Sequence, residues 1–523
     1  MSVFFYTKNK LPKSNFQMNK VFLSIVGLTI MSTTLQAQDE FDALRYGYTA
    51  YGGTARSMSI GNAMGSVGGD FASLSVNPAG IGIYRRGELS FSPSFNVSAN
   101  NSKYLGSTNS ASTSKLNISH FGLVLTSAKK VNPKKSQGWR AASFAFGMNR
   151  NATFKNEYIY SGKNNKSSLI EKFAEEFNAL GGIGAVNNVS YPAYAAYQTW
   201  LVDRGFGADS NMAVSYVPFA DGIKQTKRVF ESGGMQEYVI SAGGNYQEKL
   251  MLGLTLGIPR VTYDRTLQFD EEDASGNMSN DFKYMYFTEK LSTTGTGINL
   301  KLGTIFKPSN NFRFGIAFHT PSYIQFNDIS YIEMESHTDS LLLNNNPANN
   351  PVSLYTQDTA LSFNYAQTTP YKALASATAF FNQYGFITAD VEYVDYASMK
   401  YNYGQGYENE SAAINAIVKN TYKSAVNVRV GAEAKLEEFS LRAGVAYYGS
   451  PYKNSTYDAS RLNISGGVGY RAKHWFLDAA YVRAMQTYQQ MPYMISRANA
   501  DVRPADITNG VSNVLFTFGW KFQ

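Results

Sequence analysis

The sequence predicts an all-β fold, a 14-stranded antiparallel transmembrane β-barrel with an N-terminal hatch (plug) inside the lumen. The chain of 523 residues is rich in Tyr, Phe and Gly, and only 16% of its residues are charged, against about a quarter in an ordinary soluble domain. Beyond the N-terminus, no apolar run approaches the roughly 18 residues that a membrane-spanning helix needs. Apolar and polar residues alternate along much of the remaining chain. Because only helices and closed barrels pair all their backbone groups inside lipid, these observations favour a barrel.

The N-terminus has the layout of a secretory signal peptide, which we assign to residues 1–37. Four lysines precede the apolar run "VFLSIVGLTIM", and the small-residue stretch that follows ends in "LQAQ". This pattern predicts cleavage after Ala37, with either Met1 or Met18 as the start. Removing four lysines and no acidic residue lowers the formal net charge from +8 to +4. The basic composition is therefore no evidence for nucleic-acid binding, and we predict none.

Period-2 alternation predicts fourteen strands in the mature chain. In "KLMLGLTLGI" the leucines from Leu250 to Leu256 share one face, while Met251 and Thr255 lie on the other. In the last strand, "NVLFTFGWKFQ", Phe516, Phe518 and Trp520 face outward. The predicted spans are 88–98, 116–127, 140–160, 235–246, 249–269, 284–306, 311–334, 361–382, 384–403, 421–437, 438–451, 460–472, 474–492 and 510–523.

The connections between these strands alternate in length. Short turns such as "KPSNN", "NQY", "LEE" and "AKH" alternate with long polar loops, and 128–139 is a basic turn of intermediate length. This alternation is typical of an up-and-down outer-membrane barrel whose short turns face the periplasm. The predicted long loops are 99–115, 161–234, 270–283, 335–360, 404–420 and 493–509.

Residues 38–87 form no predicted strand, and we expect them to fill the barrel as a hatch ahead of the barrel domain, 88–523. Fourteen strands enclose a lumen wider than wall side chains can fill. The segment from Tyr51 to Gly80 is rich in Gly and Ala and almost uncharged. It ends in the turn Asn77-Pro78-Ala79-Gly80, in which proline favours an extended Asn77 and Gly80 permits a reversal into the first strand.

Several segments resemble the FadL/TodX family of outer-membrane transporters for hydrophobic compounds, in particular a subgroup often labelled hemin receptor. They are the "NPAG" that ends the Gly-rich segment, "GTGINLKLGTIFKPSNNFRFGIAFHTPS" (295–322), "FITADVEYVDYASMKY" (386–401), "LRAGVAYYGSPY" (441–452) and "RLNISGGVGYRAKHWFLDAAY" (461–481). The resemblance implies a fourteen-stranded barrel closed by a hatch. It also implies that ligands are captured outside, bound within the barrel and released sideways at a kinked third strand.

The corresponding third strand here is "AASFAFGMNRNATFKNEY", in which alternation predicts that Ala142, Phe144, Phe146 and Met148 face outward. "NRN" then interrupts the apolar rhythm. Polar residues on a lipid-facing strand are costly unless the backbone bends inward. The resemblance places a lateral opening at Gly147, Met148, Asn149, Arg150 and Asn151. The alternative is an ordinary strand that leaves the bilayer at this point.

Alternation also predicts charged side chains of both signs in the lumen. They are Lys301, Arg313, Asp390, Glu392, Arg429, Glu433, Arg442, Arg471 and Asp478. These groups either form structural ion pairs with one another and with the hatch, or Arg429 or Arg442 binds the carboxylate head group of a ligand.

The longest loop, 161–234, contains an amphipathic helical pattern. Leu169, Ile170, Phe173, Phe177 and Leu180 share one helical face. This face either forms an outer groove for hydrophobic molecules or packs as a cap on the barrel. The acidic run "DEED" (270–273) is predicted in a loop, where it is either solvated or a cation site.

Haem uptake is an alternative function, for which the four histidines are the candidate iron ligands. His120, His319, His337 and His474 lie on separate predicted elements, and His319 is expected to point inward near the outer end. One axial pair is conceivable, but no ligands cluster in the sequence. No nucleophile elbow, P-loop or zinc-ligand spacing is present. We therefore predict no enzyme, no cofactor and no metal.

The combined prediction is a monomeric barrel in the cell outer membrane, in contact with outer-membrane lipid. It would passively carry a small hydrophobic ligand, such as a long-chain fatty acid or an aromatic compound, past the hatch to a lateral exit at the third strand. The alternatives are a haem-uptake barrel, a general porin, or a scaffold or secretion-associated barrel.

Overall fold

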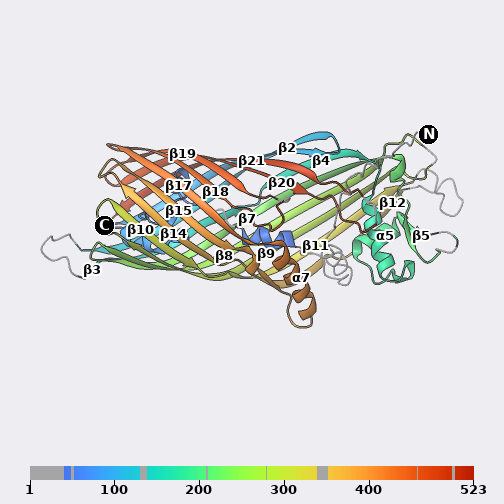
Figure 1. Ribbon diagram of the computed structural model, residues 1–523, viewed down its shortest axis with the longest axis horizontal. Helices are drawn as coiled ribbons and strands as arrows, with labels where there is room; N and C mark the ends of the chain where they lie inside the picture. The colour runs from blue at the N-terminus through green and yellow to red at the C-terminus, as the bar shows by residue number, and fades with distance from the viewer. Residues whose placement is uncertain are drawn as a thin grey trace, which may run out of the picture.

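Figure 1 shows an elongated barrel of tilted antiparallel strands in the computed structural model. The structure describes residues 40–48, 52–129, 138–205, 207, 210–277, 280–338, 352–455, 458–497 and 501–522. The predicted signal peptide, 1–37, lies outside the described residues.

The wall is a single closed sheet of fourteen antiparallel strands, which confirms the predicted fold class. Pairing of the last strand with the first, from Gly87↔Phe522 to Lys103↔Asp506, closes the barrel. Four of the fourteen strands are interrupted and carry two labels each. In order, the wall strands are β1 (Gly87–Tyr104), β2 (Ser107–Ala128), β3 (Trp139–Thr153) with β4 (Asn156–Asn164), β7 (Ile223–Tyr246), β8 (Leu250–Asp273), β9 (Tyr284–Phe306), β10 (Phe312–His319) with β11 (Tyr323–His337), β13 (Leu361–Thr368) with β14 (Lys372–Phe380), β15 (Gly385–Asp395) with β16 (Lys400–Asn402), β17 (Ser424–Leu436), β18 (Phe439–Tyr448), β19 (Arg461–Arg471), β20 (Trp475–Gln490) and β21 (Ala505–Phe522).

The predicted inward and outward faces are correct. On β8, Leu252 and Leu254 are exposed on the outer surface while Met251 and Thr255 are buried. Phe516, Phe518 and Trp520 are likewise exposed. Lipid outside and a packed lumen inside impose this alternation on the parts of the strands that lie within the membrane. None of the described helices is long and apolar enough to cross a membrane.

On one side of the barrel, the strands run much farther outward than the sequence predicts. β7 begins at Ile223 rather than 235, and β8 continues through the acidic run to Asp273. The prediction that "DEED" lies in a loop is therefore wrong, because Ile223 pairs with Asp273 in a regular ladder. In Figure 1 this extension reaches beyond the rest of the wall at the end opposite the short turns.

A helical cap packs on the outer extension. It contains α5 (Leu169–Ala179), α6 (Tyr191–Gln198), and the small sheet of β5 (Val202–Arg204) and β6 (Ala213–Ser215). The apolar face of α5 is buried against wall residues such as Phe269 and Met285. Buried Glu271 of β8 accepts hydrogen bonds from Ser168 Oγ at 2.5 Å and Leu169 N at 2.9 Å, which anchors the start of α5. Of the two interpretations of this face, packing as a cap agrees with its burial.

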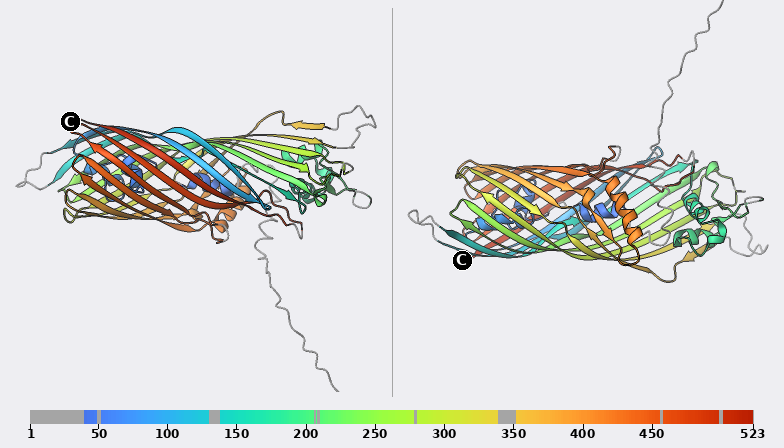
Figure 2. Two further views of the ribbon diagram at one scale, coloured as in Figure 1. Left: turned by 90° about the horizontal axis from the view of Figure 1, so that it is seen from above. Right: turned by 60° about the horizontal axis from the view of Figure 1, so that its bottom comes forward.

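Short helices occupy the barrel interior ahead of β1. They are α2 (Glu40–Gly47), α3 (Ala55–Ser59), α4 (Ser73–Val76) and the 3-10 helix η1 (Pro78–Ile83). Figures 1 and 2 show α2 near mid-length of the barrel, with the following helices nearer the short-turn end. Outside the wall, the remaining described elements include β12 (Val352–Thr356), which pairs with β11, and α7 (Glu408–Thr421).

Candidate functional site

The segment 52–84 lies across the bore and is hydrogen-bonded to several strands of the wall. We call it the plug. Ala55 N donates to Thr517 Oγ1 of β21 at 2.6 Å. Gly65 N donates to Asp390 Oδ2 of β15 at 3.1 Å. These strands lie far apart in the sheet order, so the segment is tied to distant parts of the wall. That it acts as a movable hatch, and that 38–87 is a domain of its own, stay predictions.

Asn77 joins two parts of the plug to the wall. Its Oδ1 accepts from Ala79 N at 3.1 Å, which caps η1. Its Nδ2 donates to Gly65 O at 2.6 Å and to Thr304 O of β9 at 3.1 Å. The backbone of Asn77 is extended, at φ −141° and ψ 105°, as the following Pro78 predicts. One carboxamide thus fixes the plug to itself and to the barrel.

Gly80 closes the turn that begins at Asn77, because its N donates to Asn77 O at 3.0 Å. Gly80 lies within η1 and has no positive φ. A Cβ at this position would meet the Ser73 side chain and lie 3.1 Å from Gly68 Cα. Glycine is favoured here because two parts of the plug pass in close contact, and not because the turn needs a positive φ.

An ion-pair chain joins the plug to the wall near the short turns. Arg56 of α3 contacts Glu433 of β17 at 3.0 Å. The same carboxylate contacts Arg442 of β18 at 2.7 Å, and Arg442 also contacts Asp478 at 2.7 Å. The three wall side chains are almost completely buried. Because Arg442 already meets two carboxylates, its contacts favour the structural interpretation over the head-group one.

Replacing Arg56 with methionine tests this chain as a latch. We expect the closed plug to lose about 2 kcal/mol, because Glu433 keeps Arg442 while the plug loses its ionic anchor. That loss corresponds to roughly 30-fold more frequent opening events in planar bilayers. Lys224→Met is the control, since Lys224 and Glu272 form an exposed pair away from the plug. Equal opening frequencies in the Arg56 variant and wild type would show that the chain is no latch.

Arg429 is the other predicted head-group residue. It is fully buried on β17, and its Nη2 lies 3.7 Å from Asp390 Oδ2 and 3.5 Å from Glu392 Oε2. The two carboxylates offset its charge, so a ligand carboxylate would compete with them. A head-group role for Arg429 or Arg442 stays a prediction.

The third wall strand departs from its neighbour partway along its length. β2 pairs with β3 only from Ala128↔Ala141 to His120↔Asn149. Beyond that point the third strand keeps only its ladder with β7, which runs along the whole of β3 and has a register shift between Arg150 and Ala152. We call this departure the wall break. Gly147 and Met148 still lie in the ladder with β2, so of the five predicted residues only Arg150 and Asn151 lie past its end.

The plug contacts the wall break directly. Gly52 N donates to Arg150 O at 2.8 Å, using a carbonyl that has no ladder partner on β2. The guanidinium of Arg150 donates from Nε to Ile118 O of β2 at 3.1 Å and so bridges the break. Asn149 Nδ2 donates to Ser75 Oγ of the plug at 2.9 Å. The plug is therefore bonded to the third strand where the break begins.

Two carboxamides with unused hydrogen-bonding atoms belong to the strands that border the wall break. Asn117 of β2 and Asn151 of β3 are each 5% exposed. Among the described residues, both polar atoms of the Asn117 side chain and Asn151 Oδ1 have no hydrogen-bond partner. Buried amides normally have partners. Their state here is typical of a site that receives water or a polar ligand group.

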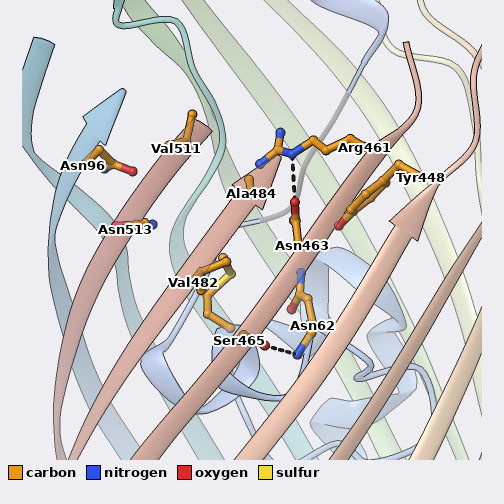
Figure 3. Close-up of a pocket in the computed structure, with 12 residues that line it drawn as sticks. Asn62, Asn96, Tyr448, Arg461, Asn463, Ser465, Val482, Ala484, Val511 and Asn513 are labelled. Atoms are coloured by element: carbon orange, nitrogen blue, oxygen red, sulfur yellow. Dashed lines mark hydrogen bonds between the residues drawn. The ribbon is translucent and has the colours of Figure 1, made fainter. Parts of the chain in front are cut away.

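The break adjoins a small internal cavity of about 40 Å³. Asn151 lines it together with Tyr46 of α2, Lys301, His319 and Pro370. A second cavity of about 60 Å³ lies between the plug and β18–β21. Figure 3 shows its polar lining, where Arg461 Nε donates to Asn463 Oδ1 at 2.9 Å. Each space holds only a few waters, so a larger ligand requires part of the interior to move.

Two of the four histidines are hydrogen-bonded within the barrel wall and to the plug. His120 is buried between Ser90 Oγ, at 2.8 Å, and Asn149 Oδ1, at 3.1 Å. His319 points inward as expected, but at the level of the plug rather than near the outer end, because its Nε2 lies 2.9 Å from Val76 O. Within the described residues, no three His, Cys, Asp or Glu side chains could together hold a metal ion. No finding supports the hemin-receptor label.

Comparison with solved structures identifies proteins that share this architecture. A FadL homologue from Pseudomonas aeruginosa superposes with a TM-score of 0.52 and 13% identity, covering 91% of this chain and 100% of that one. The chain has the fold of a FadL-type barrel. The toluene transporter TodX of P. putida gives 0.51 and 10% identity, covering 90% of this chain and 99% of its own. No family model and no curated protein matches the sequence. A barrel of this type, with apolar residues on its outer surface, fits the outer membrane.

Proposed function

We propose that this protein passively carries small hydrophobic molecules across the outer membrane and releases them sideways at the wall break. The observation that carries the proposal is the wall break itself, where β3 leaves β2 while the plug closes the bore beneath. A ligand that enters from the outer end then has a lateral route into lipid and a blocked axial route.

Passage through the wall suits an apolar cargo. It leaves the lumen for the bilayer without crossing water, so its transfer costs no exposure of apolar surface. Ions and sugars gain nothing from this route, since lipid excludes them. The FadL-type fold and the toluene transporter among its neighbours support the same class of cargo.

Two alternatives have less support. A general porin needs a continuous aqueous path. Here the plug is hydrogen-bonded to separate strands of the wall, and the two cavities beside it are small. A catalytic role has no support in the named neighbours, one of which is a transporter and the other a FadL homologue. A fatty-acid cargo, hatch gating at Asn77–Gly80 and a monomeric state are parts of the proposal that need separate tests.

Reconstitution into liposomes tests the function. We expect faster equilibration of toluene or a long-chain fatty acid than in protein-free liposomes, together with no steady conductance in planar bilayers. Organic extraction of the purified protein, followed by mass spectrometry, should identify a co-bound hydrophobic molecule. A steady open conductance without faster hydrophobe uptake would contradict the proposal and favour a porin.

A further inference from the structure

The ring of Tyr46, on α2, is enclosed by three aromatic side chains of the wall. It stacks on Phe326 with a centroid distance of 4.7 Å and an interplanar angle of 29°. It meets Phe154 edge-on at 6.1 Å and Tyr263 edge-on at 6.2 Å. Only 1% of Tyr46 is exposed. We call Phe154, Tyr263 and Phe326 the aromatic cage.

The cage is held by the wall and does not depend on α2. Tyr263 of β8 donates its hydroxyl to Glu231 Oε1 at 2.7 Å. Phe154 lies between β3 and β4, past the wall break, and packs on Tyr263 at 5.6 Å. Phe326 of β11 lies across Gly295 of β9, where an added Cβ would be 2.5 Å from its ring. The three rings would therefore keep their positions if Tyr46 left.

α2 is buried against the wall and also makes polar contacts with it. Gln367 Nε2 donates to Ala43 O at 2.8 Å. Arg45 Nη2 lies 3.7 Å from Glu231 Oε1, and its guanidinium lies 4.4 Å from the Tyr263 ring centroid. A helix of 8 residues is unstable without tertiary contacts. A ligand that replaces the Tyr46 ring therefore competes with the tertiary contacts on which α2 depends.

Polar groups around the cage favour a ring that carries a hydrogen-bonding group. Departure of α2 removes Ala43 O from Gln367, whose Oε1 already has no hydrogen-bond partner among the described residues. It also removes Arg45 from Glu231, which leaves a carboxylate able to accept from a ligand hydroxyl. Tyr365 stacks on Phe326 at 5.2 Å, and its buried hydroxyl also has no partner within the described part of the chain. A plain alkyl chain would offer no hydrogen bond to Gln367 Oε1 or to the Tyr365 hydroxyl, whereas a ring with a hydroxyl group would.

We propose that the aromatic cage binds small phenol-like molecules, and that Tyr46 occupies it as an internal ligand until such a molecule displaces it. This inference rests on the proposed transport function and adds a ligand class and a resident competitor. The cage lies next to the wall break. A ligand that displaces Tyr46 is therefore already beside the proposed lateral exit.

Equilibrium dialysis of p-cresol, the side-chain analogue of tyrosine, tests the inference on the purified full chain. If α2 is docked at least nine-tenths of the time, Tyr46→Ala should strengthen p-cresol binding about 10-fold or more, because the competitor is gone. Adding Phe326→Leu should abolish the gain. Tyr48→Ala is the matched control, since Tyr48 packs on Tyr396 outside the cage. Toluene, which lacks the hydroxyl, should bind the Tyr46→Ala cage more weakly than p-cresol.

A second measurement needs no variant. Saturating p-cresol should increase hydrogen exchange in residues 40–48 of the wild-type protein while exchange in β8 and β9 stays constant. Unchanged p-cresol affinity in Tyr46→Ala, together with unchanged exchange in 40–48, would overturn the inference. Hydrophobe uptake that persists in that case would leave the proposed function standing. A stronger p-cresol affinity in a protein that fails to carry hydrophobes would support the cage and contradict the transport proposal.

Discussion

Gly303→Val is expected to convert the closed barrel into a steadily conducting one. Gly303 lies on the inner face of β9, where an added Cβ would overlap Asn77 Oδ1 and lie 3.0 Å from Pro78 Cδ. Neighbouring Gly253 similarly lies against Pro78, so no side chain fits between the plug and this wall. Valine would push Asn77 away from its bonds to Gly65 and Thr304 and release one side of the plug. The backbone ladder of β9 does not require glycine at this position, and valine is favoured in strands. The barrel should therefore still fold.

The measurement is conductance in planar bilayers, with heat-modifiable migration in gels as the check on folding. Gly466→Val is the matched control, because a Cβ there meets only Arg442 O, at an ordinary 3.6 Å. Deletion of residues 52–83 serves as the second variant and should give a still larger steady conductance. A deletion variant that folds and stays closed would show that something other than this segment blocks the bore.

The strand positions within the membrane follow from the sequence because lipid on one side and lumen on the other impose alternation. The predicted span 284–306 coincides with β9 at both ends. Outside the bilayer both faces of a strand meet water or the cap, and the pattern disappears. Residues 223–234 of β7 and the acidic end of β8 therefore read as loop, although they continue their ladders. The length of a strand outside the bilayer depends on its pairing with a neighbouring strand, and this pairing cannot be seen in the sequence of one strand alone.

The interior is predictable only in outline. A nearly uncharged Gly-rich segment ending in Asn77-Pro78-Ala79-Gly80 predicts that 38–87 enters the bore, and Asn77 is extended as the following proline favours. The register of the strands decides which glycines of the wall contact this segment. The contacts of Gly253 and Gly303 with the plug therefore cannot be predicted from the local sequence. The aromatic cage was not predicted, because its rings come from three distant strands. Its signal was present only as single aromatic residues at inward positions of strands, as at Tyr263 and Phe326.

Deletion of Asn151 is expected to close the lateral route. Arg150 pairs with Gln236 of β7, and the next pair is Ala152 with Met235, so Asn151 is one residue in excess on the third strand. An extra residue bends a strand and ends its pairing on one side. Removing it makes the register with β7 continuous and lets the ladder with β2 proceed past Asn149 to Ser119 and Ile118.

We expect the deletion to reduce hydrophobe uptake into liposomes at least about 10-fold, because a cargo in the lumen would meet an intact ladder of strand hydrogen bonds, whose separation costs about 1 kcal/mol or more per bond. Asn151→Ala is the matched control: it removes the carboxamide but keeps the residue count, and so keeps the break. If the deletion and the alanine variant lose uptake equally, the side chain rather than the backbone departure matters. If the folded deletion variant carries hydrophobes at the wild-type rate, the cargo does not leave between β2 and β3, and an axial route past the plug must take its place.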